Sequence, residues 1–286
     1  MHIHWFPGHM AKAQRMIREQ LSLIDVVIEL LDARIPVSSA NPIIAELIGS
    51  KPRVVALNKA DLAEAGRTGE WIRHFRSQGL TTVSLDAASG KGTKELVSKV
   101  EQEASEKIAK LTAKGIKGRA VRAMILGIPN VGKSSLINRL LGTATAKTGD
   151  RPGVTRGQQW LKVGKNLELL DTPGVLWPKM DDQEVAFKLA VTGAIKDDIY
   201  DMEKVILRLL EILQENYSER LRERYKLLQA ELPEDTAELL ALIGAKRGCL
   251  RSGGAVDEEK ARRIILTDFR SGKLGQFTLD NSNMGE

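Results

Sequence analysis

The fold of this 286-residue chain is decided by the stretch Gly127-Ile128-Pro129-Asn130-Val131-Gly132-Lys133-Ser134. This stretch matches the pattern G-x-x-x-x-G-K-[ST] at every fixed position, between an apolar run ending at Leu126 and a helical pattern over residues 134–141. A strand, a glycine-rich turn and a helix in this order are the context of a phosphate-binding P-loop. The backbone N–H groups of such a loop surround a phosphate, and the helix N-terminus adds its dipole.

A second motif, Asn58-Lys59-Ala60-Asp61, follows directly on the β-rich run at residues 54–57. An aspartate carboxylate can accept two hydrogen bonds from guanine N1–H and N2–H₂, whereas adenine offers no matching pair of donors. We expect Asn58 to bind guanine N7 and to brace the neighbouring loop, while the stem of Lys59 covers the base. Together with a P-loop in the same chain, the motif predicts GTP and GDP as ligands.

Shorter motifs complete the expected site. In Asp171-Thr172-Pro173-Gly174, the aspartate suits a water-mediated Mg²⁺ contact and the Gly174 N–H suits the γ-phosphate. By position alone, Thr155 is the switch threonine that closes on Mg²⁺ when the γ-phosphate is present. Asp86-Ala87-Ala88-Ser89-Gly90 fits the loop in which a backbone N–H, best placed at Ala87, meets guanine O6.

These motifs give a full set of expected roles. Lys133 would reach the β and γ phosphates, and it is a catalytic candidate together with Thr155. The expected Mg²⁺ ligands are Ser134, Thr155 and, through water, Asp171. The residues expected to contact the nucleotide are Asn58, Lys59, Ala60, Asp61, Asp86, Ala87, Asn130, Val131, Gly132, Lys133, Ser134, Ser135 and Gly174.

The order of the motifs is unusual. Ordinary small GTPases run from P-loop to switch threonine, D-x-x-G, N-K-x-D and the O6 loop. Here the last two, at residues 58–61 and 86–88, precede the P-loop at residues 127–134. The simplest account is that the old termini were joined and new ones opened after the D-x-x-G strand, which a sheet tolerates. The sequence therefore predicts a circularly permuted P-loop GTPase domain.

The pattern of apolar residues divides the chain into two parts. Short β-rich runs at residues 26–31, 54–57, 123–126 and 167–170 alternate with helical patterns such as residues 94–111. This alternation predicts an α/β domain with a mostly parallel, doubly wound sheet over residues 1–180. Apolar residues at helical spacing over residues 183–273 predict a smaller all-helical domain, residues 181–286. The tail after Lys273 is polar and is expected to fray.

Composition limits the possible partners. The net charge is +6, and residues 105–165 hold thirteen Lys/Arg against two acids, which favours a polyanionic partner. A second basic cluster consists of Lys246, Arg247, Arg251, Arg262, Arg263 and Arg270. The single cysteine, Cys249, fits a reducing cytosol, and no apolar run is long enough to span a bilayer. We expect a cytoplasmic, monomeric protein that binds neither membrane nor DNA.

The opening Trp5-Phe6-Pro7-Gly8-His9-Met10, the segment Asp32-Ala33-Arg34-Ile35-Pro36 and the permuted order resemble the ribosome biogenesis GTPase A (YlqF/RbgA) family. The resemblance covers essentially the whole chain, and it implies that the helical domain of residues 181–286 docks on RNA or the ribosome. It implies a GTP-hydrolysing assembly factor for the large (50S) ribosomal subunit, which binds the particle in a nucleotide-dependent way. It also implies a slow, Mg²⁺-dependent GTPase activity that the subunit stimulates.

Two further roles stay open beside this resemblance. Val175 stands where Ras-like GTPases carry the glutamine that orients the attacking water. His9 would either supply this missing group or merely pack or contact the partner. In similar GTPases the equivalent of Asn130 holds K⁺ near the phosphates through its carbonyl, whereas here Asn130 could equally only shape the loop.

Two other kinds of function remain to be weighed. A signalling or trafficking GTPase at a membrane is disfavoured because the chain carries no myristoylation pattern and no prenylation box. A P-loop kinase for a small metabolite is disfavoured because the motif at residues 58–61 demands guanine. Binding to ribosomal RNA that weakens steeply with salt would separate the assembly factor from both.

Overall fold

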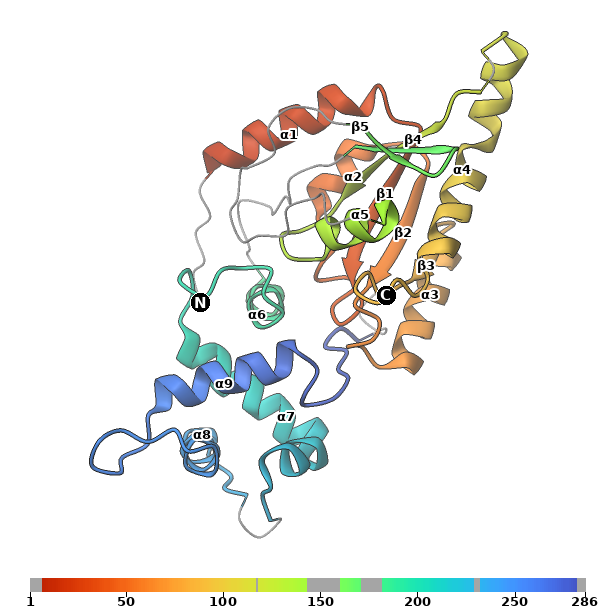
Figure 1. Ribbon diagram of the computed structural model, residues 1–286. Coiled ribbons are helices and arrows are strands. Elements are labelled where there is room, and N and C mark those ends of the chain that lie inside the picture. The colour runs from red at the N-terminus through yellow and green to blue at the C-terminus, as the bar shows by residue number, and fades with distance from the viewer. Residues whose placement is uncertain (1–6, 117, 143–159, 171–181, 229–231, 282–286) are drawn as a thin grey trace. The chain divides into compact units, whose positions relative to one another are not determined.

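A computed structural model describes residues 7–116, 118–142, 160–170, 182–228 and 232–281 (Figure 1). Within these ranges the chain forms two compact units. The first unit, the nucleotide unit, contains the described residues of 7–170 together with residues 277–281. The second, the helical unit, contains the described residues of 182–276. The return of residues 277–281 to the first unit differs from the expected frayed tail.

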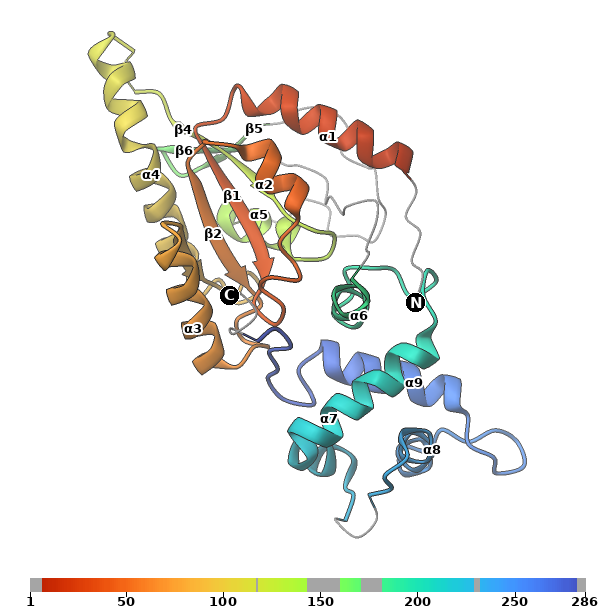
Figure 2. The same cartoon turned by 180° about the vertical axis from the view of Figure 1, so that it is seen from behind.

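The nucleotide unit is built on one six-stranded sheet with the order β3-β2-β1-β4-β6-β5. The strands are β1 (Val26–Asp32), β2 (Arg53–Asn58), β3 (Thr81–Ser84), β4 (Val121–Leu126), β5 (Trp160–Val163) and β6 (Leu167–Leu170). All neighbours pair in parallel except β5, which is antiparallel to β6. Figure 2 shows β1 and β2 running side by side in the same direction. The predicted mostly parallel sheet is confirmed.

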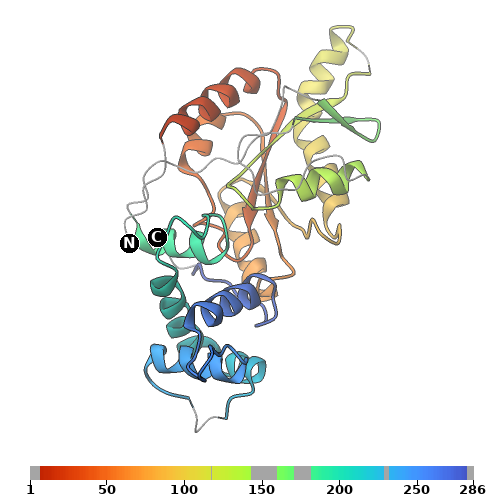
Figure 3. The ribbon, with the colours of Figure 1, turned by 60° about the vertical axis from the view of Figure 1, so that its left-hand side comes forward.

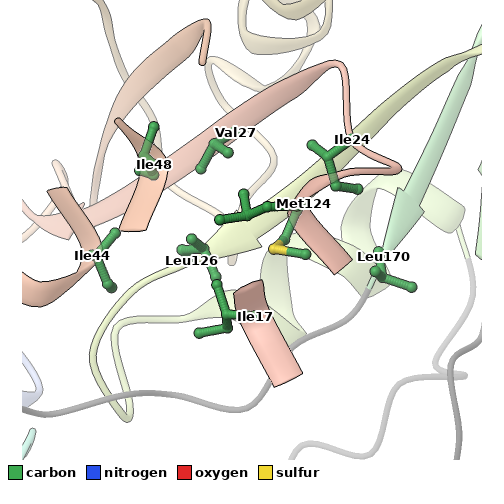
Figure 4. Packing of buried hydrophobic residues seen from close by; sticks show 9 residues of the cluster. Ile17, Ile24, Val27, Ile44, Ile48, Met124, Leu126 and Leu170 are labelled. Atoms are coloured by element: carbon green, nitrogen blue, oxygen red, sulfur yellow. The ribbon is translucent and has the colours of Figure 1, made fainter. Parts of the chain in front are cut away.

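Five helices of the described chain cover this sheet: α1 (Pro7–Leu21), α2 (Pro42–Ile48), α3 (Ala65–Ser77), α4 (Thr93–Ala113) and α5 (Lys133–Leu141). Figure 3 shows α1 and α2 on one side of the sheet and α4 and α5 on the other. In Figure 4, Ile17 of α1 and Ile44 and Ile48 of α2 converge on Met124 and Leu126 of β4. Burial of these aliphatic side chains fixes the central strand β4, from which the P-loop leaves.

The helical unit contains α6 (Gln183–Val191), α7 (Met202–Tyr225), α8 (Thr236–Lys246) and α9 (Glu258–Arg270), with a kink in α7 at Tyr217. Each helix begins after an aspartate whose carboxylate accepts backbone N–H groups of the first turn: Asp182, Asp201, Asp235 and Asp257. Such N-caps satisfy donors that have no partner inside the helix. None of the helices in the described part of the chain is long and apolar enough to cross a membrane.

Candidate nucleotide site

The P-loop connects β4 to α5 and passes close to the backbone of β1. A Cβ atom at Gly127 would lie 2.5 Å from the carbonyl oxygen of Leu30, so only glycine fits there. Gly132 has a φ of 105°, and a Cβ on it would lie 2.2 Å from Asn58 Nδ2. Both glycines of the motif are therefore required by close approach, and Gly132 also by its backbone conformation.

The polar residues of the P-loop lie at the start of α5, where helix N–H groups can face an anion. The buried ammonium of Lys133 donates to the carbonyl oxygens of Ile128 at 2.8 Å and Gly127 at 3.2 Å. Ser134 and Ser135 lie in the first turn of α5. Asn130 is exposed and has a φ of 56°, a left-handed conformation that asparagine adopts more readily than most residues. This conformation supplies a physical reason for an asparagine that shapes the loop.

Asn58 joins the P-loop to the predicted O6 loop. Its side chain is buried, and its amide nitrogen donates to the carbonyl oxygen of Val131 at 2.7 Å. Its amide oxygen accepts the N–H of Ala87 at 3.0 Å. Three motifs that lie far apart in the sequence, at residues 58–61, 86–90 and 127–134, thus meet at one side chain. The expected bracing by Asn58 is present with both partners defined.

The O6 loop departs from the expectation in one contact. Ala87 is only 4% exposed, and because Asn58 takes its N–H, that group does not face outward as predicted. Asp86 accepts the N–H groups of Ala88 at 2.8 Å and Ser89 at 3.2 Å, and both of these residues are exposed. The exposed side of the loop is therefore formed by Ala88 and Ser89. Arg139 of α5 donates to the carbonyl oxygen of Ala88 and joins this loop to the P-loop helix.

Lys59 and Asp61 occupy different environments. Lys59 has a φ of 60°, and its Nζ lies 3.1 Å from Asp32 Oδ2. Asp61 is exposed, and its partial burial and the nearby Asp86 carboxylate raise the pKa of Asp61 above its usual range. The Asp61 carboxylate is therefore open to a base that approaches from solvent.

The carboxylate of Asp32, at the end of β1, is buried between two cations. Arg34 donates to it through Nε at 2.9 Å and Nη2 at 2.7 Å, a bidentate pair. Lys59, which belongs to the motif at residues 58–61 (the guanine motif), forms an ion pair with the same carboxylate. Burial alone would raise the pKa of Asp32, but Arg34 and Lys59 outweigh it and hold the pKa well below its usual range. Sequence reasoning quoted Asp32 and Arg34 without assigning them a role, and it missed Arg139, for which no motif gives a signal.

Several predicted residues lie outside the described part of the site. Thr155, Asp171, Gly174 and Val175 belong to this group. For His9 the structure describes the backbone, which lies in the first turn of α1, but not the side chain.

The basic stretch at residues 105–165 has acidic partners that its sequence does not contain. Lys107 and Arg119 both form ion pairs with Asp25, at 2.7 and 3.0 Å. Arg122 pairs with Glu168 at 3.2 Å. These three cations are therefore less available to a polyanionic partner than the charge balance of the stretch indicates, because the fold brings acids from β6 and from the turn before β1 beside them.

The side chains of the second basic cluster do not all point to solvent on the same side of the helical unit. Arg262 and Arg263 are neighbours on α9, but the side chain of Arg262 is 16% exposed and that of Arg263 is 72% exposed. The pairs within the helical unit are Arg262 with Glu203, Arg263 with Glu259, and Arg270 with Asp197. Lys246 and Arg247, at the end of α8, are exposed. The six basic residues therefore do not share one face, because α9 turns Arg262 toward α7.

Comparison with known proteins identifies relatives over the full chain. The family described as "50S ribosome-binding GTPase" matches residues 122–240. Ribosome biogenesis GTPase A of Priestia megaterium is 53% identical over 100% of this chain and 99% of its own. The protein of the same name from Bacillus cereus is 54% identical over 98% of this chain and 94% of its own length. The crystal structure of GNP-bound YlqF from T. maritima is 26% identical, with a TM-score of 0.65, over 95% of this chain and 98% of that one.

Proposed function

Since this chain belongs to the ribosome biogenesis GTPase A family, it is a GTPase that acts in ribosome assembly, and we propose that its GTP-bound form binds the large ribosomal subunit. The observation that supports nucleotide binding is the pair of hydrogen bonds made by the Asn58 side chain. One buried amide holds the P-loop at Val131 and the O6 loop at Ala87, so that phosphate and base can be bound in a single pocket.

Guanine selection is assigned to the exposed carboxylate of Asp61, which would accept N1–H and N2–H₂ of the base. The N–H of Asn58 that does not point to Val131 would meet N7. Lys59 is fixed at its backbone and, through Asp32, at its ammonium, so its stem is suited to cover the base.

The phosphates would lie at the start of α5, within reach of the ammonium of Lys133. The hydroxyl of Ser134 is a hard oxygen donor of the kind Mg²⁺ prefers, and Thr155 and, through water, Asp171 would complete its ligands. When bound, the ion neutralises developing phosphate charge. Gly174 would donate its N–H to the γ-phosphate, so that hydrolysis releases the loops that Thr155 and Gly174 belong to.

Water activation is assigned to His9, because the side chain of Val175 has no hydrogen-bonding atom to orient the attacking water. A neutral imidazole could take this role when the partner positions it. Asn130 would hold K⁺, whose charge substitutes for an arginine finger. Its left-handed backbone fits that role and a purely loop-shaping role equally, so an ion-dependence experiment must separate them.

Docking on the subunit is assigned to cations whose side chains are exposed, whether or not they form ion pairs at the surface. They include Lys110 and Lys114 on or beside α4, Lys162 and Lys165 around β5, and Lys246 and Arg247 at the end of α8. Phosphate contacts of this kind would make affinity fall steeply with salt. We place the protein in the cytoplasm, where ribosomes assemble, and as a monomer on the particle.

The proposal is tested by GTP hydrolysis with purified large or small subunits, in KCl and in NaCl at equal ionic strength. The large subunit should raise the rate by about a hundredfold or more, because it completes the catalytic groups. The small subunit should have no effect. His9→Ala should bind the large subunit in the presence of a non-hydrolysable GTP analogue but lose the stimulated rate, whereas His74→Gln on α3 should keep it.

Each part of the proposal has its own contrary result. Equal stimulation by both subunits would contradict the partner. A normal stimulated rate for His9→Ala would remove histidine from the mechanism, and equal rates in the two salts would remove K⁺. Equal affinity of the subunit for the analogue-bound and GDP-bound forms would contradict the nucleotide switch.

A further inference from the structure

Residues 277–281, here called the C-terminal strap, lie in the nucleotide unit although they follow the last helix of the helical unit. Figure 1 draws the strap as the dark blue stretch that ends beside α3. The N–H of Phe277 donates to the carbonyl oxygen of Leu62 at 3.0 Å, and the N–H of Glu64 donates to Thr278 Oγ1 at 3.2 Å. Phe277 is buried. The strap thus binds the segment that follows Asp61 directly.

Asp280 fixes the other side of the strap. Its carboxylate is 3% exposed and accepts the N–H groups of Val37 and Ser38, both at 2.8 Å. The Ser38 hydroxyl donates to the same carboxylate at 2.6 Å. The N–H of Leu279 donates to the carbonyl oxygen of Arg34 at 2.8 Å. Hydrogen bonds to an ionised carboxylate are stronger than neutral ones, so Asp280 is a firm attachment for residues 34–38.

The two segments that the strap joins both lead to the guanine motif. The carbonyl oxygen of Arg34 accepts a hydrogen bond from the strap, and its guanidinium donates to the Asp32 carboxylate. The same carboxylate forms an ion pair with the ammonium of Lys59. Leu62, held by Phe277, donates its N–H to the carbonyl oxygen of Lys59 at 2.9 Å, which closes the turn that contains Asp61. The turn that carries Lys59 and Asp61 is therefore fixed from both sides through the strap.

We propose that the C-terminal strap is a positioning element of the guanine pocket, which holds Asp61 in place to receive the base. In this proposal the strap acts through Leu62 and through the Arg34–Asp32–Lys59 chain, and not through a contact of its own with the base. This inference rests on the proposed role of Asp61 as the guanine reader. Loosening the strap should weaken the contribution of the base to binding more than that of the phosphates, which the P-loop supplies.

The test compares dissociation constants for GDP and for inosine diphosphate, which lacks the N2 amino group that Asp61 would bind. In Asp280→Ala the GDP constant should rise by about tenfold and the inosine diphosphate constant much less, so discrimination falls. Asp280→Asn should stay near the original values, since its carbonyl can accept both N–H groups and the Ser38 hydroxyl can turn to accept from the amide.

Asp235→Ala is the matched control, because Asp235 also accepts two backbone N–H groups, at 2.8 and 2.9 Å, but caps α8 in the helical unit. It should lower the melting temperature without changing discrimination between the two nucleotides. Should Asp280→Ala fail to fold, Ser38→Ala removes a single hydroxyl bond and should reduce discrimination by about threefold.

Two outcomes would overturn the inference in distinguishable ways. If the unaltered protein binds GDP and inosine diphosphate equally, the guanine assignment of Asp61 fails, and the role of the strap fails with it. If the unaltered protein discriminates and the Asp280→Ala and Ser38→Ala variants discriminate equally well, Asp61 keeps its role and the strap has no positioning function.

Discussion

The side-chain amide of Asn58 is a single residue on which the assembly of the nucleotide site depends. It satisfies a carbonyl of the P-loop and an N–H of the O6 loop, and both of these partners belong to buried residues. A buried polar group that loses its partner retains the cost of leaving water. The P-loop and the O6 loop are therefore held at a fixed spacing by this one side chain.

Asn58→Ala should lower the free energy of unfolding by about 1–3 kcal/mol, because both loop groups lose a buried partner. It should also weaken GDP binding by about tenfold or more, because the O6 loop and the P-loop are then no longer joined through Asn58. Urea unfolding and equilibrium GDP binding measure the two effects. Asn41→Ala is the control, because Asn41 is as buried and caps α2 through Ile43. Equal losses of GDP affinity in both variants would contradict a specific role for Asn58.

Residue types predict which chemical groups the site should contain, but not the individual contacts that these groups make after folding. The motifs identify Lys133, Asn58 and Asp61 because phosphate and guanine demand those groups. They cannot show which of Ala87 and Ala88 faces outward, since that depends on where the Asn58 oxygen lies after folding. Asp280 carries no signal at all, because its partners are backbone N–H groups 242 or more residues earlier in the chain.

At the level of elements, the buried strands and amphipathic helices were predictable from apolar runs and spacing. The structure confirms β1, β2, β4 and β6 and the helical pattern that becomes α4. It adds β3 and β5, which have only four residues each and mix polar with apolar side chains. Such short strands form because a neighbouring strand supplies hydrogen bonds, so their own sequence gives little signal.

The turn before β1 shows why charge runs are hard to interpret from sequence alone. Asp25 has a side chain with 0% exposure and binds Lys107 of α4 and Arg119 from the chain before β4. Burial would raise the pKa of Asp25, but the hydrogen bond from Lys107, the N–H of Arg122 and the charge of Arg119 together lower it. Part of the basic stretch therefore stabilises the fold, and only the remainder is available to a polyanionic partner.

Asp25→Asn should destabilise the protein at neutral pH by about 1–2 kcal/mol, a value limited by solvent screening of the half-exposed Lys107. The pKa of Asp25 is lowered on folding, so its contribution exists above the unfolded pKa and disappears as pH falls through the folded one. Urea unfolding at a series of pH values should show the two proteins converging on acidification. Glu259→Gln, in an exposed pair with Arg263, should cost little at any pH. A pH-independent difference between Asp25→Asn and the unaltered protein would contradict the ion-pair explanation.

At the level of the whole molecule, the motif order and the sheet order agree on a permuted domain. The P-loop leaves β4 in the centre of the sheet, whereas the guanine motif leaves β2, two strands away and earlier in the chain. The sequence predicted this arrangement, because motif positions survive permutation. It did not predict that the chain returns to the nucleotide unit after α9. A deletion from residue 183 onward therefore removes the strap together with the helical unit and cannot isolate docking.

The central claim is that this permuted set of loops forms one guanine-reading pocket with Asp61 as the base contact. Its most direct test is the binding of GDP and xanthosine diphosphate to the unaltered protein and to Asp61→Asn. The unaltered protein should prefer GDP, and Asp61→Asn should lose GDP affinity by about a hundredfold and prefer xanthosine diphosphate, because an amide donor then faces the added carbonyl. A preference of the unaltered protein for xanthosine diphosphate, or an Asp61→Asn variant that still prefers GDP, would contradict the claim.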